Sequence, residues 1–395
     1  MTGRDVVIVS ACRTPIGGYL GSLRPLRAAE LGGVVVAEAV RRAGVDVAVI
    51  DECVMGHVLQ AGQGQNPARQ AALNGGLPST VNALTVNKVC GSGLRAVMLA
   101  AQSIALGEAE VVVAGGMESM SNAPHVQFCL REGVRMGDFL TVDALIRDGL
   151  WCAFNDVHMG SLAEYTAVRA GLSRGQLDEF SAASQQKAAR AIEMGAFSGE
   201  VTAVEVPQRK GSPLSFEVDE TVKAGTTVET LAALRPAFEK GGMVTAGNSP
   251  GLTDGASALV LTSREFAHAH GLPAMATIRE GAVTHRDPKD VFFAPIDAVR
   301  KVMAKGAYGI GDFDLIEANE AFAAQCLADG AELGWDWERV NVNGGAIALG
   351  HPIGASGARI LTTLLYALRA REARRGLATL CLGGGGAVAL VVERA

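Results

Sequence analysis

Residues 91–96 read GSGLRA, and a near copy, ASGARI, occupies residues 355–360 far downstream. After each stretch, apolar residues recur at helical spacing and lead to a short apolar run that ends in glycines. The first run is VVVAGG at 111–116, and the second is ATLCLGGG at 378–385. A repeat with so long a separation indicates a duplicated domain, because solenoid repeats are much shorter. The chain is therefore predicted to contain two diverged copies of one α/β unit.

The whole chain is predicted to form three units that pack together. Residues 1–119 alternate short β-rich runs with helical patterns, which predicts a mostly parallel sheet with helical crossovers. Residues 120–247 are rich in loops, with one amphipathic helix expected at 177–192. The expected units are an N-terminal half at 1–119 plus 248–272, an inserted loop domain at 120–247, and a C-terminal half at 273–395.

Composition excludes several classes of function. The net charge of −6, without a long Lys/Arg run, argues against nucleic-acid binding. No apolar stretch is expected to reach the ~18 residues of a membrane span, and the N-terminal residues resemble a strand rather than a signal peptide. The seven cysteines lack regular spacing, which favours reduced thiols in a cytoplasmic protein. No pair has zinc-like spacing, so no metal is expected.

Cys90 is the first candidate for chemistry. It comes directly before the predicted helix of the first copy. The N-terminus of a helix carries a partial positive charge, which favours the thiolate, and the neighbouring glycines allow another molecule to approach the sulfur. A buried structural cysteine is the ordinary alternative.

The duplication brings three further candidates, Asn319, His351 and Cys381, to strand ends or helix starts, where α/β proteins gather their chemistry. Imidazole is the usual base for a cysteine thiol, although a lone histidine is more often a satisfied loop or core residue. Asn319 is equally compatible with a helix N-cap. A hydrolase needs only one nucleophile, so the second thiol points to carbon–carbon chemistry.

With these motifs in view, the chain resembles the thiolase family over essentially its whole length, and most closely the acetyl-CoA acetyltransferase branch. The fold implied is a layered α-β-α-β-α core of duplicated βαβαβ units with an inserted loop domain. The motifs that carry the resemblance are NKVCGSG at 87–93, GGMESMS at 115–121, HMG at 158–160, NEAFA at 319–323, NGGAIALGHPIG at 343–354 and CLGGG at 381–385.

The resemblance implies a role for each catalytic candidate. Cys90 is the nucleophile that accepts the acyl group. His351 activates it and shares an oxyanion hole with a water held by Asn319. Cys381 shuttles the α-proton, and the backbone N–H groups of Cys90 and Gly383 form a second oxyanion hole.

The resemblance also implies that coenzyme A is a co-substrate, with acyl-CoA as the other substrate, and that no cofactor is tightly bound. Lys223 stands where an arginine often contacts the nucleotide end of CoA, and Pro250 replaces a serine that helps to hold it. The loop at 120–140 resembles one that joins dimers into tetramers, so a homo-oligomer, tetramer or dimer, is expected, and an accessory subunit is not excluded. The expected lining of the CoA tunnel is His158 and Met159 at the pantetheine channel, with Leu150, Phe238, Ala246, Ala321 and Phe322.

The acyl preference remains open between two alternatives. The stretch DVFFAP at 290–295 replaces a Met-Gly-small-Gly stretch beside the acyl pocket of acetyl-transferring relatives, and Gly386 replaces a methionine. The main expectation is reversible cleavage and condensation of acetoacetyl-CoA in fatty acid metabolism. The alternative is a 3-ketoacyl-CoA thiolase for a bulkier, branched or aromatic acyl group. A decarboxylating ketoacyl synthase and a catalytically silent acyl-CoA-binding scaffold are the other hypotheses, and the intact Cys90, His351 and Cys381 disfavour both.

Overall fold

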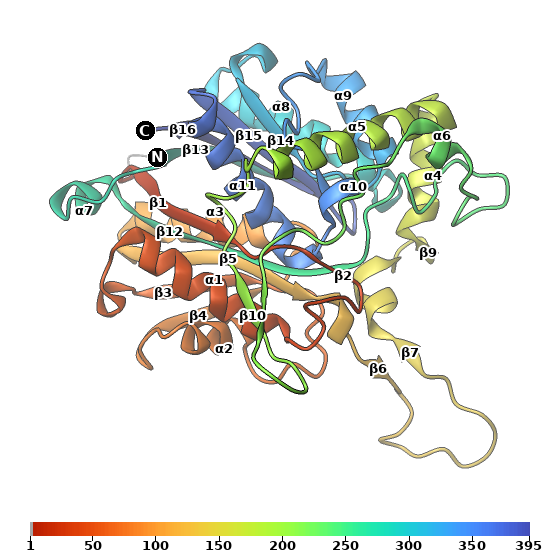
Figure 1. Cartoon of the computed structure of the whole chain (residues 1–395), viewed down its shortest axis with the longest axis horizontal. Helices are drawn as coiled ribbons and strands as arrows, with labels where there is room; N and C mark the ends of the chain where they lie inside the picture. Colours follow the sequence, from red (N-terminus) through yellow and green to blue (C-terminus); the bar gives the residue numbers. More distant parts are fainter. Residues whose placement is uncertain (1–2) are drawn as a thin grey trace.

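The computed structural model describes residues 3–395, and its centre is a ten-stranded sheet with helices packed against it (Figure 1). β1 and β13 join the two halves of the sheet through only two residue pairs. In order across the sheet the strands are β14 (Leu315–Ala318), β15 (Arg375–Leu382), β16 (Gly386–Arg394), β13 (Ala276–His285), β1 (Val6–Arg13), β12 (Thr253–Ser263), β5 (Val111–Ser119), β3 (Glu52–Gly56) and β4 (Asn82–Val86), with the short β2 (Gly17–Gly18) beside β12.

The predicted duplication is confirmed by the order of the elements. β1, β3, β5 and β12 of the first half correspond in order and pairing to β13, β14, β15 and β16 of the second. In place of β4, the second half has only an isolated bridge between Ile316 and Val340. The helices correspond as α1 (Ala28–Ala43) with α8 (Ala294–Gly306), α2 (Pro67–Asn74) with α9 (Ala323–Leu333), and α3 (Ser92–Leu106) with α11 (Ile353–Ala370).

The expectation of a mostly parallel sheet is wrong in one respect. β3 pairs in parallel with β4 and β5, but β12 lies between β1 and β5 and is antiparallel to both. In the second half, β16 is likewise antiparallel to β13 and β15, so each half carries one reversed strand. The sheet is therefore mixed.

Three apolar clusters define five layers. One cluster joins α1 and α2 to the outer face of the first half-sheet, and another joins α8 and α9 to the outer face of the second. The largest cluster places α3 and α11 between the two half-sheets. Contrary to expectation, the stretch Val89–Leu106 is long and apolar enough for a membrane span by length and composition alone. It contains α3, so its apolar character is explained by the central layer.

The repeated GSG-type stretch lies where α3 and α11 touch. A Cβ atom on Gly93 would lie 2.8 Å from Ala358 N, and one on Gly357 would lie 2.3 Å from Leu94 N. Both distances are shorter than real carbon contacts, so only glycine allows this approach. The contact brings the N-terminal ends of the two helices side by side, and with them the residues that precede each helix.

Residues 120–247 lie over the edge where these helix ends meet. The region carries an extended arm, residues 127–140, that projects from the body between β6 and β7 (Figure 1). Its elements are η2 (Met120–Asn122), β6 (His125–Val126), β7 (Val142–Asp143), η3 (Leu145–Leu150), β8 (Trp151–Cys152), β9 (Val157–His158), α4 (Met159–Arg169), α5 (Arg174–Glu193), β10 (Val204–Val206), β11 (Leu214–Phe216) and α6 (Val228–Ala232). The remaining short elements are η1 (Val47–Val49), α7 (Arg264–Ala269), η4 (Pro288–Phe293), η5 (Ile310–Asp312) and α10 (Ala346–Leu349).

Candidate active site

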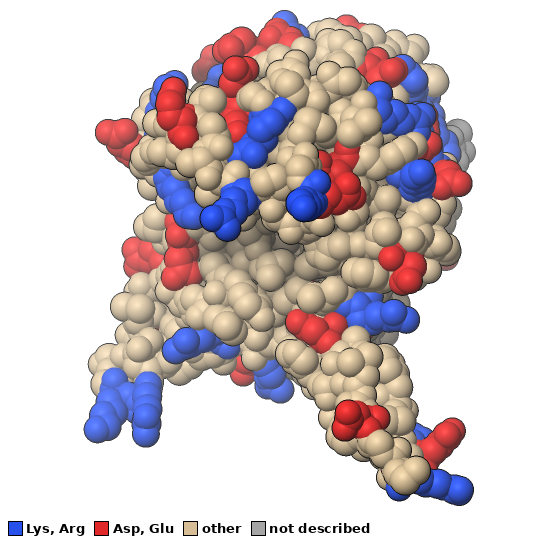
Figure 2. All heavy atoms as spheres, turned by 90° about the vertical axis from the view of Figure 1, so that its right-hand side faces the viewer, with Lys and Arg blue, Asp and Glu red and all other residues tan. Residues whose placement is uncertain are grey.

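A cavity of about 450 Å³ opens where the two halves and the loop region meet. Figure 2 shows the face that carries α4 and the arm; it is hollowed near its centre, with Lys and Arg side chains mixed with Asp and Glu around the hollow. The cavity is lined by eleven of the thirteen residues singled out in the sequence: Cys90, His351, Cys381, Gly383, Leu150, His158, Met159, Phe238, Ala246, Ala321 and Phe322.

Cys90 is presented to the cavity by a strained turn before α3. Val89 has a φ of 48°, which is rare for a β-branched residue, and the Ser92 hydroxyl donates to Val89 O at 2.6 Å. Burial raises the pKa of Cys90 to about 11, while the backbone N–H groups of Gly383 and Cys90 oppose the rise. The N–H groups at the helix start therefore act toward the thiolate, as expected, but burial has the larger effect and raises the pKa of the thiol overall.

His351 is held in one tautomer by Ser356. The Ser356 hydroxyl donates to Pro352 O at 3.0 Å, so its oxygen accepts the proton of His351 Nδ1, 2.6 Å away. The lone pair is then on Nε2, which lies 3.5 Å from the Asn319 amide nitrogen. Burial lowers the pKa of His351 to about 3. The ring is therefore neutral at physiological pH and can accept a proton.

Asn319 lies behind His351 and is fully buried, so it is not in the cavity lining. Within residues 3–395, its Oδ1 has no hydrogen-bond partner. A buried polar atom without a partner is costly unless a water or ligand satisfies it. Asn319 therefore has one amide oxygen free to bind a water, while its amide nitrogen lies near His351 Nε2.

Cys381 lies in β15, one position before its end at Leu382, and lines the cavity. It is buried among apolar residues that include Phe292, Ala321 and Phe322. Burial raises the pKa of Cys381 well above its ordinary value, and a thiolate on Cys90 would raise it further. Cys90 and Cys381 both line the same cavity.

The tunnel side of the cavity is aromatic. The His158 ring stacks on Phe238 at 4.9 Å, and Phe238 meets Phe322 edge-on at 6.1 Å. Pro250 also lines this cavity. Lys223 does not: its backbone N–H donates to Gln185 Oε1, and its side chain is not part of the lining. The structure therefore does not bring Lys223 together with the other candidates.

Two residues of η4 form part of the cavity lining. Val291 and Phe292 are buried and line the cavity, and the Phe292 ring meets Phe322 edge-on at 5.2 Å. Phe293 points elsewhere, since its ring lies 4.8 Å below the Arg169 guanidinium. Only one of the two phenylalanines therefore shapes this cavity.

Two positioning residues were missed in the sequence. Ser356 lies in the repeated ASGARI stretch, and its equivalence to Ser92 beside Cys90 could have identified it from the sequence. Glu118 accepts from Leu59 N at 3.2 Å and from Gly354 N at 2.9 Å, so it ties the first half-sheet to the start of α11. The sequence feature that could have identified Glu118 is the carboxylate inside the GGMESMS motif. Across residues 3–395, no group of three or more His, Cys, Asp or Glu side chains is arranged to hold a metal ion.

Comparison with known families agrees with this geometry. The model of the thiolase N-terminal domain matches residues 6–265, and that of the thiolase C-terminal domain matches residues 272–394. The chain belongs to the thiolase family. Its resemblance to this family is therefore confirmed, together with its class as an acyltransferase enzyme.

Several thiolases are similar to this chain over their full length. It is 56% identical over 391 residues to an acetyl-CoA acetyltransferase of Pseudomonas aeruginosa, covering 99% of this chain and 100% of that protein. It is 53% identical to an acetyl-CoA acetyltransferase of Escherichia coli, covering 99% of each. The crystal structure of the Bacillus anthracis acetyl-CoA acetyltransferase matches this thiolase with a TM-score of 0.98 and 42% identity, covering 100% of both chains.

Proposed function

We propose that this thiolase is an acetyl-CoA C-acetyltransferase, which cleaves acetoacetyl-CoA with CoA into two acetyl-CoA molecules and catalyses the reverse Claisen condensation. The observation that carries the proposal is the meeting of two neutral thiols, Cys90 and Cys381, with a neutral His351 in one cavity. The similar proteins named acetyl-CoA acetyltransferase support the same activity. CoA acts as a co-substrate, and no tightly bound cofactor is proposed.

Cleavage begins at Cys90. Because the thiol is protonated at rest, its proton passes to His351 Nε2 as the sulfur attacks the 3-keto carbon. The bond between C2 and C3 then breaks and leaves an acetyl group on Cys90. The departing carbanion of acetyl-CoA takes a proton from the Cys381 thiol, and the proton on His351 restores Cys381.

The acetyl group then leaves Cys90. The thiol of a second CoA attacks the acetyl carbonyl, gives up its proton to His351, and that proton returns to the Cys90 sulfur as it is released. Two sites hold the developing oxyanions. The N–H groups of Cys90 and Gly383 suit the carbonyl bound to the Cys90 sulfur. His351 and a water on the unpartnered Asn319 Oδ1 suit the carbonyl of the departing acetyl-CoA.

The packing around Cys381 supports a small acyl group. Val291 and Phe292 line the cavity and belong to the same apolar cluster as Cys381, and we infer that they limit the length of the acyl chain there. The bulkier 3-ketoacyl substrate considered from the sequence is therefore the less favoured candidate, because aromatic packing of Phe292 on Phe322 resists opening.

We also infer a homo-oligomer, tetramer or dimer, and a cytoplasmic role in fatty acid metabolism. The arm at 127–140 exposes Phe128, Met136 and Leu140, and exposed apolar groups of this size are typical of an interface. All seven cysteines are unpaired thiols, which suits a reducing compartment. An accessory subunit would be recognised as a second protein band, beside that of this chain, in a denaturing gel after mild purification.

The test uses purified protein with acetoacetyl-CoA and CoA. We expect acetyl-CoA to form, and mass spectrometry after incubation with acetyl-CoA to show an added acetyl group on the peptide that contains Cys90. The variant Cys90→Ala should lose both signals. An acetyl group found on Cys381 would reverse the two roles, and absence of cleavage by the wild type would reject the proposed activity.

A further inference from the structure

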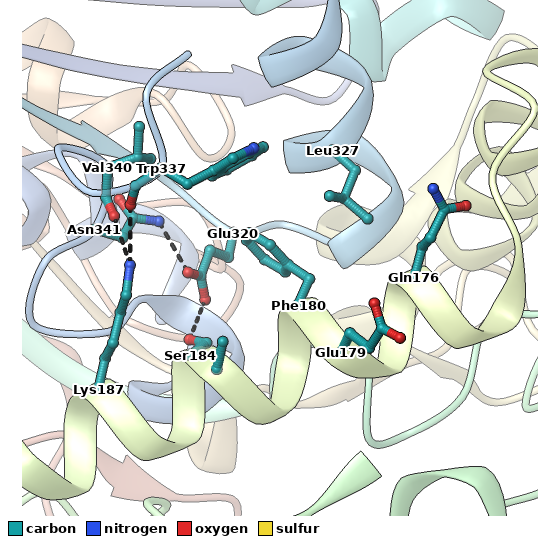
Figure 3. A pocket seen from close by; sticks show the side chains of 11 residues that line it. Gln176, Glu179, Phe180, Ser184, Lys187, Glu320, Leu327, Trp337, Val340 and Asn341 are labelled. Atoms are coloured by element: carbon teal, nitrogen blue, oxygen red, sulfur yellow. Dashed lines mark hydrogen bonds between the residues drawn. The ribbon is translucent and has the colours of Figure 1, made fainter.

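A second cavity, of about 330 Å³, lies outside the active site between α5 and the segments that follow β14 and α9 (Figure 3). The buried carboxylate of Glu320 faces it, next in the chain to Asn319. Figure 3 shows Ser184 and Asn341 pointing at this carboxylate, while Lys187 points at the carbonyl groups of Trp337 and Val340. None of these residues has a role in the reaction described above.

Three donors from three segments converge on Glu320. Oε2 accepts from Ser184 Oγ at 2.7 Å and from Ile347 N at 3.0 Å, and Oε1 accepts from Asn341 Nδ2 at 2.9 Å. They belong to α5, to α10 and to the loop after Val340. Every contact is a donor, so the acceptor-only carboxylate form fits the site.

Two of these donors, Asn341 and Ile347, also belong to the segments that hold the two residues of one oxyanion site. Asn341 accepts from Ala318 N at 2.9 Å and donates to Ala318 O at 2.8 Å, so it fixes the strand end that carries Asn319. Ile347 belongs to α10, which leads directly into His351. Glu320 is thus the point at which the segments of Asn319 and His351 are joined.

We propose that Glu320 is a positioning residue, which sets the separation of Asn319 and His351 and thereby the oxyanion site used when the carbon–carbon bond breaks or forms. This inference rests on the proposed function. The effect is expected on one step only, since the other oxyanion site uses the N–H groups of Cys90 and Gly383. His351 is also anchored independently through Ser356, so its transfer of the Cys90 proton is less dependent on Glu320.

On the side away from the cavity, the backbone lies close against Glu320. A Cβ atom on Gly345 would lie 2.3 Å from Glu320 Oε1, so only glycine fits there. A glutamine in place of Glu320 would turn an amide NH2 toward at least one of the three donors. The resulting repulsion should displace the Asn319 segment without changing the size of the side chain.

The experiment compares Glu320→Gln and Ser184→Ala with the control Glu179→Gln. Glu179 lines the same cavity from the same helix but is solvent-exposed. Two steps are measured separately: exchange of the acetyl-CoA α-protons with solvent deuterium, and single-turnover acetylation of Cys90. The midpoint of thermal unfolding, kcat and KM for acetoacetyl-CoA are measured in parallel.

For Glu320→Gln we expect kcat and proton exchange to fall about tenfold or more, on the scale of a lost charged hydrogen bond. KM and the acetylation rate should change by less than about threefold, and Glu179→Gln should match the wild type. A uniform loss in both steps, or none, would overturn the inference. Should Glu320→Gln fail to fold, Ser184→Ala decides: a selective loss of exchange supports the role, and unchanged exchange overturns it. A wild type without cleavage activity would reject the proposed function itself, whereas an active wild type with an unaffected Glu320→Gln rejects this inference alone.

Discussion

At the scale of single residues, burial moves the reactive groups toward their uncharged forms. The pKa of Cys90 is raised to about 11, that of Cys381 is raised further above its ordinary value, and that of His351 is lowered to about 3. Protons must therefore move during each bond-making step, since no charged nucleophile is stored in the free enzyme. Such a site avoids an exposed thiolate, which is the form that oxidants attack most readily.

The first prediction concerns the pH dependence of Cys90 acetylation. His351 accepts a proton only while it is neutral, and its lowered pKa keeps it neutral until the pH approaches about 3. Cys90 remains a thiol until the pH approaches about 11. The single-turnover rate should thus be flat between about pH 5 and pH 9. An acid limb with an apparent pKa near that of free histidine would show that His351 is not the shifted base.

The second prediction separates the two thiols. The variant Cys381→Ala should still be acetylated at Cys90, because the nucleophile and its base are intact. It should lose exchange of the acetyl-CoA α-protons with solvent deuterium by at least about a hundredfold, as expected on removing an acid–base group. Mass spectrometry follows both signals in one sample. Exchange at the wild-type rate would mean that another group moves the proton.

At the scale of elements, we expect η4 to limit the length of the acyl group that the cavity accepts. In Phe292→Ala, kcat/KM for 3-ketohexanoyl-CoA should rise about tenfold relative to that for acetoacetyl-CoA, since two additional methylene groups gain about 1.6 kcal/mol when buried. Phe293→Ala is the matched control, because its ring lies against Arg169 rather than in the cavity. The same gain in both variants would indicate a general loosening instead of a specific opening.

The arm at 127–140 is the element that should determine assembly. Met136 is 95% exposed and Phe128 is 73% exposed, and burying such side chains contributes about 1.5–3 kcal/mol each. Replacing Phe128, Met136 and Leu140 by serine should lower the mass measured by light scattering from tetramer to dimer. Asp138→Asn in the same arm is the control. A wild-type monomer would contradict the oligomer, and a wild-type dimer would contradict only the tetramer.

At the scale of the whole molecule, the internal repeat predicted two copies of one α/β unit, whereas the five-layered core was implied by the resemblance to thiolases. GSGLRA and ASGARI mark the two helices that cross at Gly93 and Gly357, and Cys90 and His351 precede these equivalent helix starts. The direction of β12 did not follow, because periodicity identifies a strand but not its orientation.

Other parts of the site depended on tertiary context. The raised pKa of Cys90 was not predictable, since the sequence shows a helix start but not which groups surround the sulfur in the cavity. Glu118 and Glu320 are ordinary carboxylates in the sequence, and only the fold shows which backbone groups converge on them. Lys223 is not among the residues that line the cavity, and its contact with the nucleotide end of CoA stays a prediction.

Because α3 and α11 cross between the two halves, enzymatic activity should depend closely on how the halves are packed together. Cys90 precedes one helix, and His351 precedes the other, so neither half carries a complete reaction centre. A slight parting of the halves would stop turnover while each half keeps its own secondary structure. Inactivation in urea should accordingly have a lower midpoint than the loss of far-ultraviolet circular dichroism, and coincident midpoints would show that the halves separate only on global unfolding.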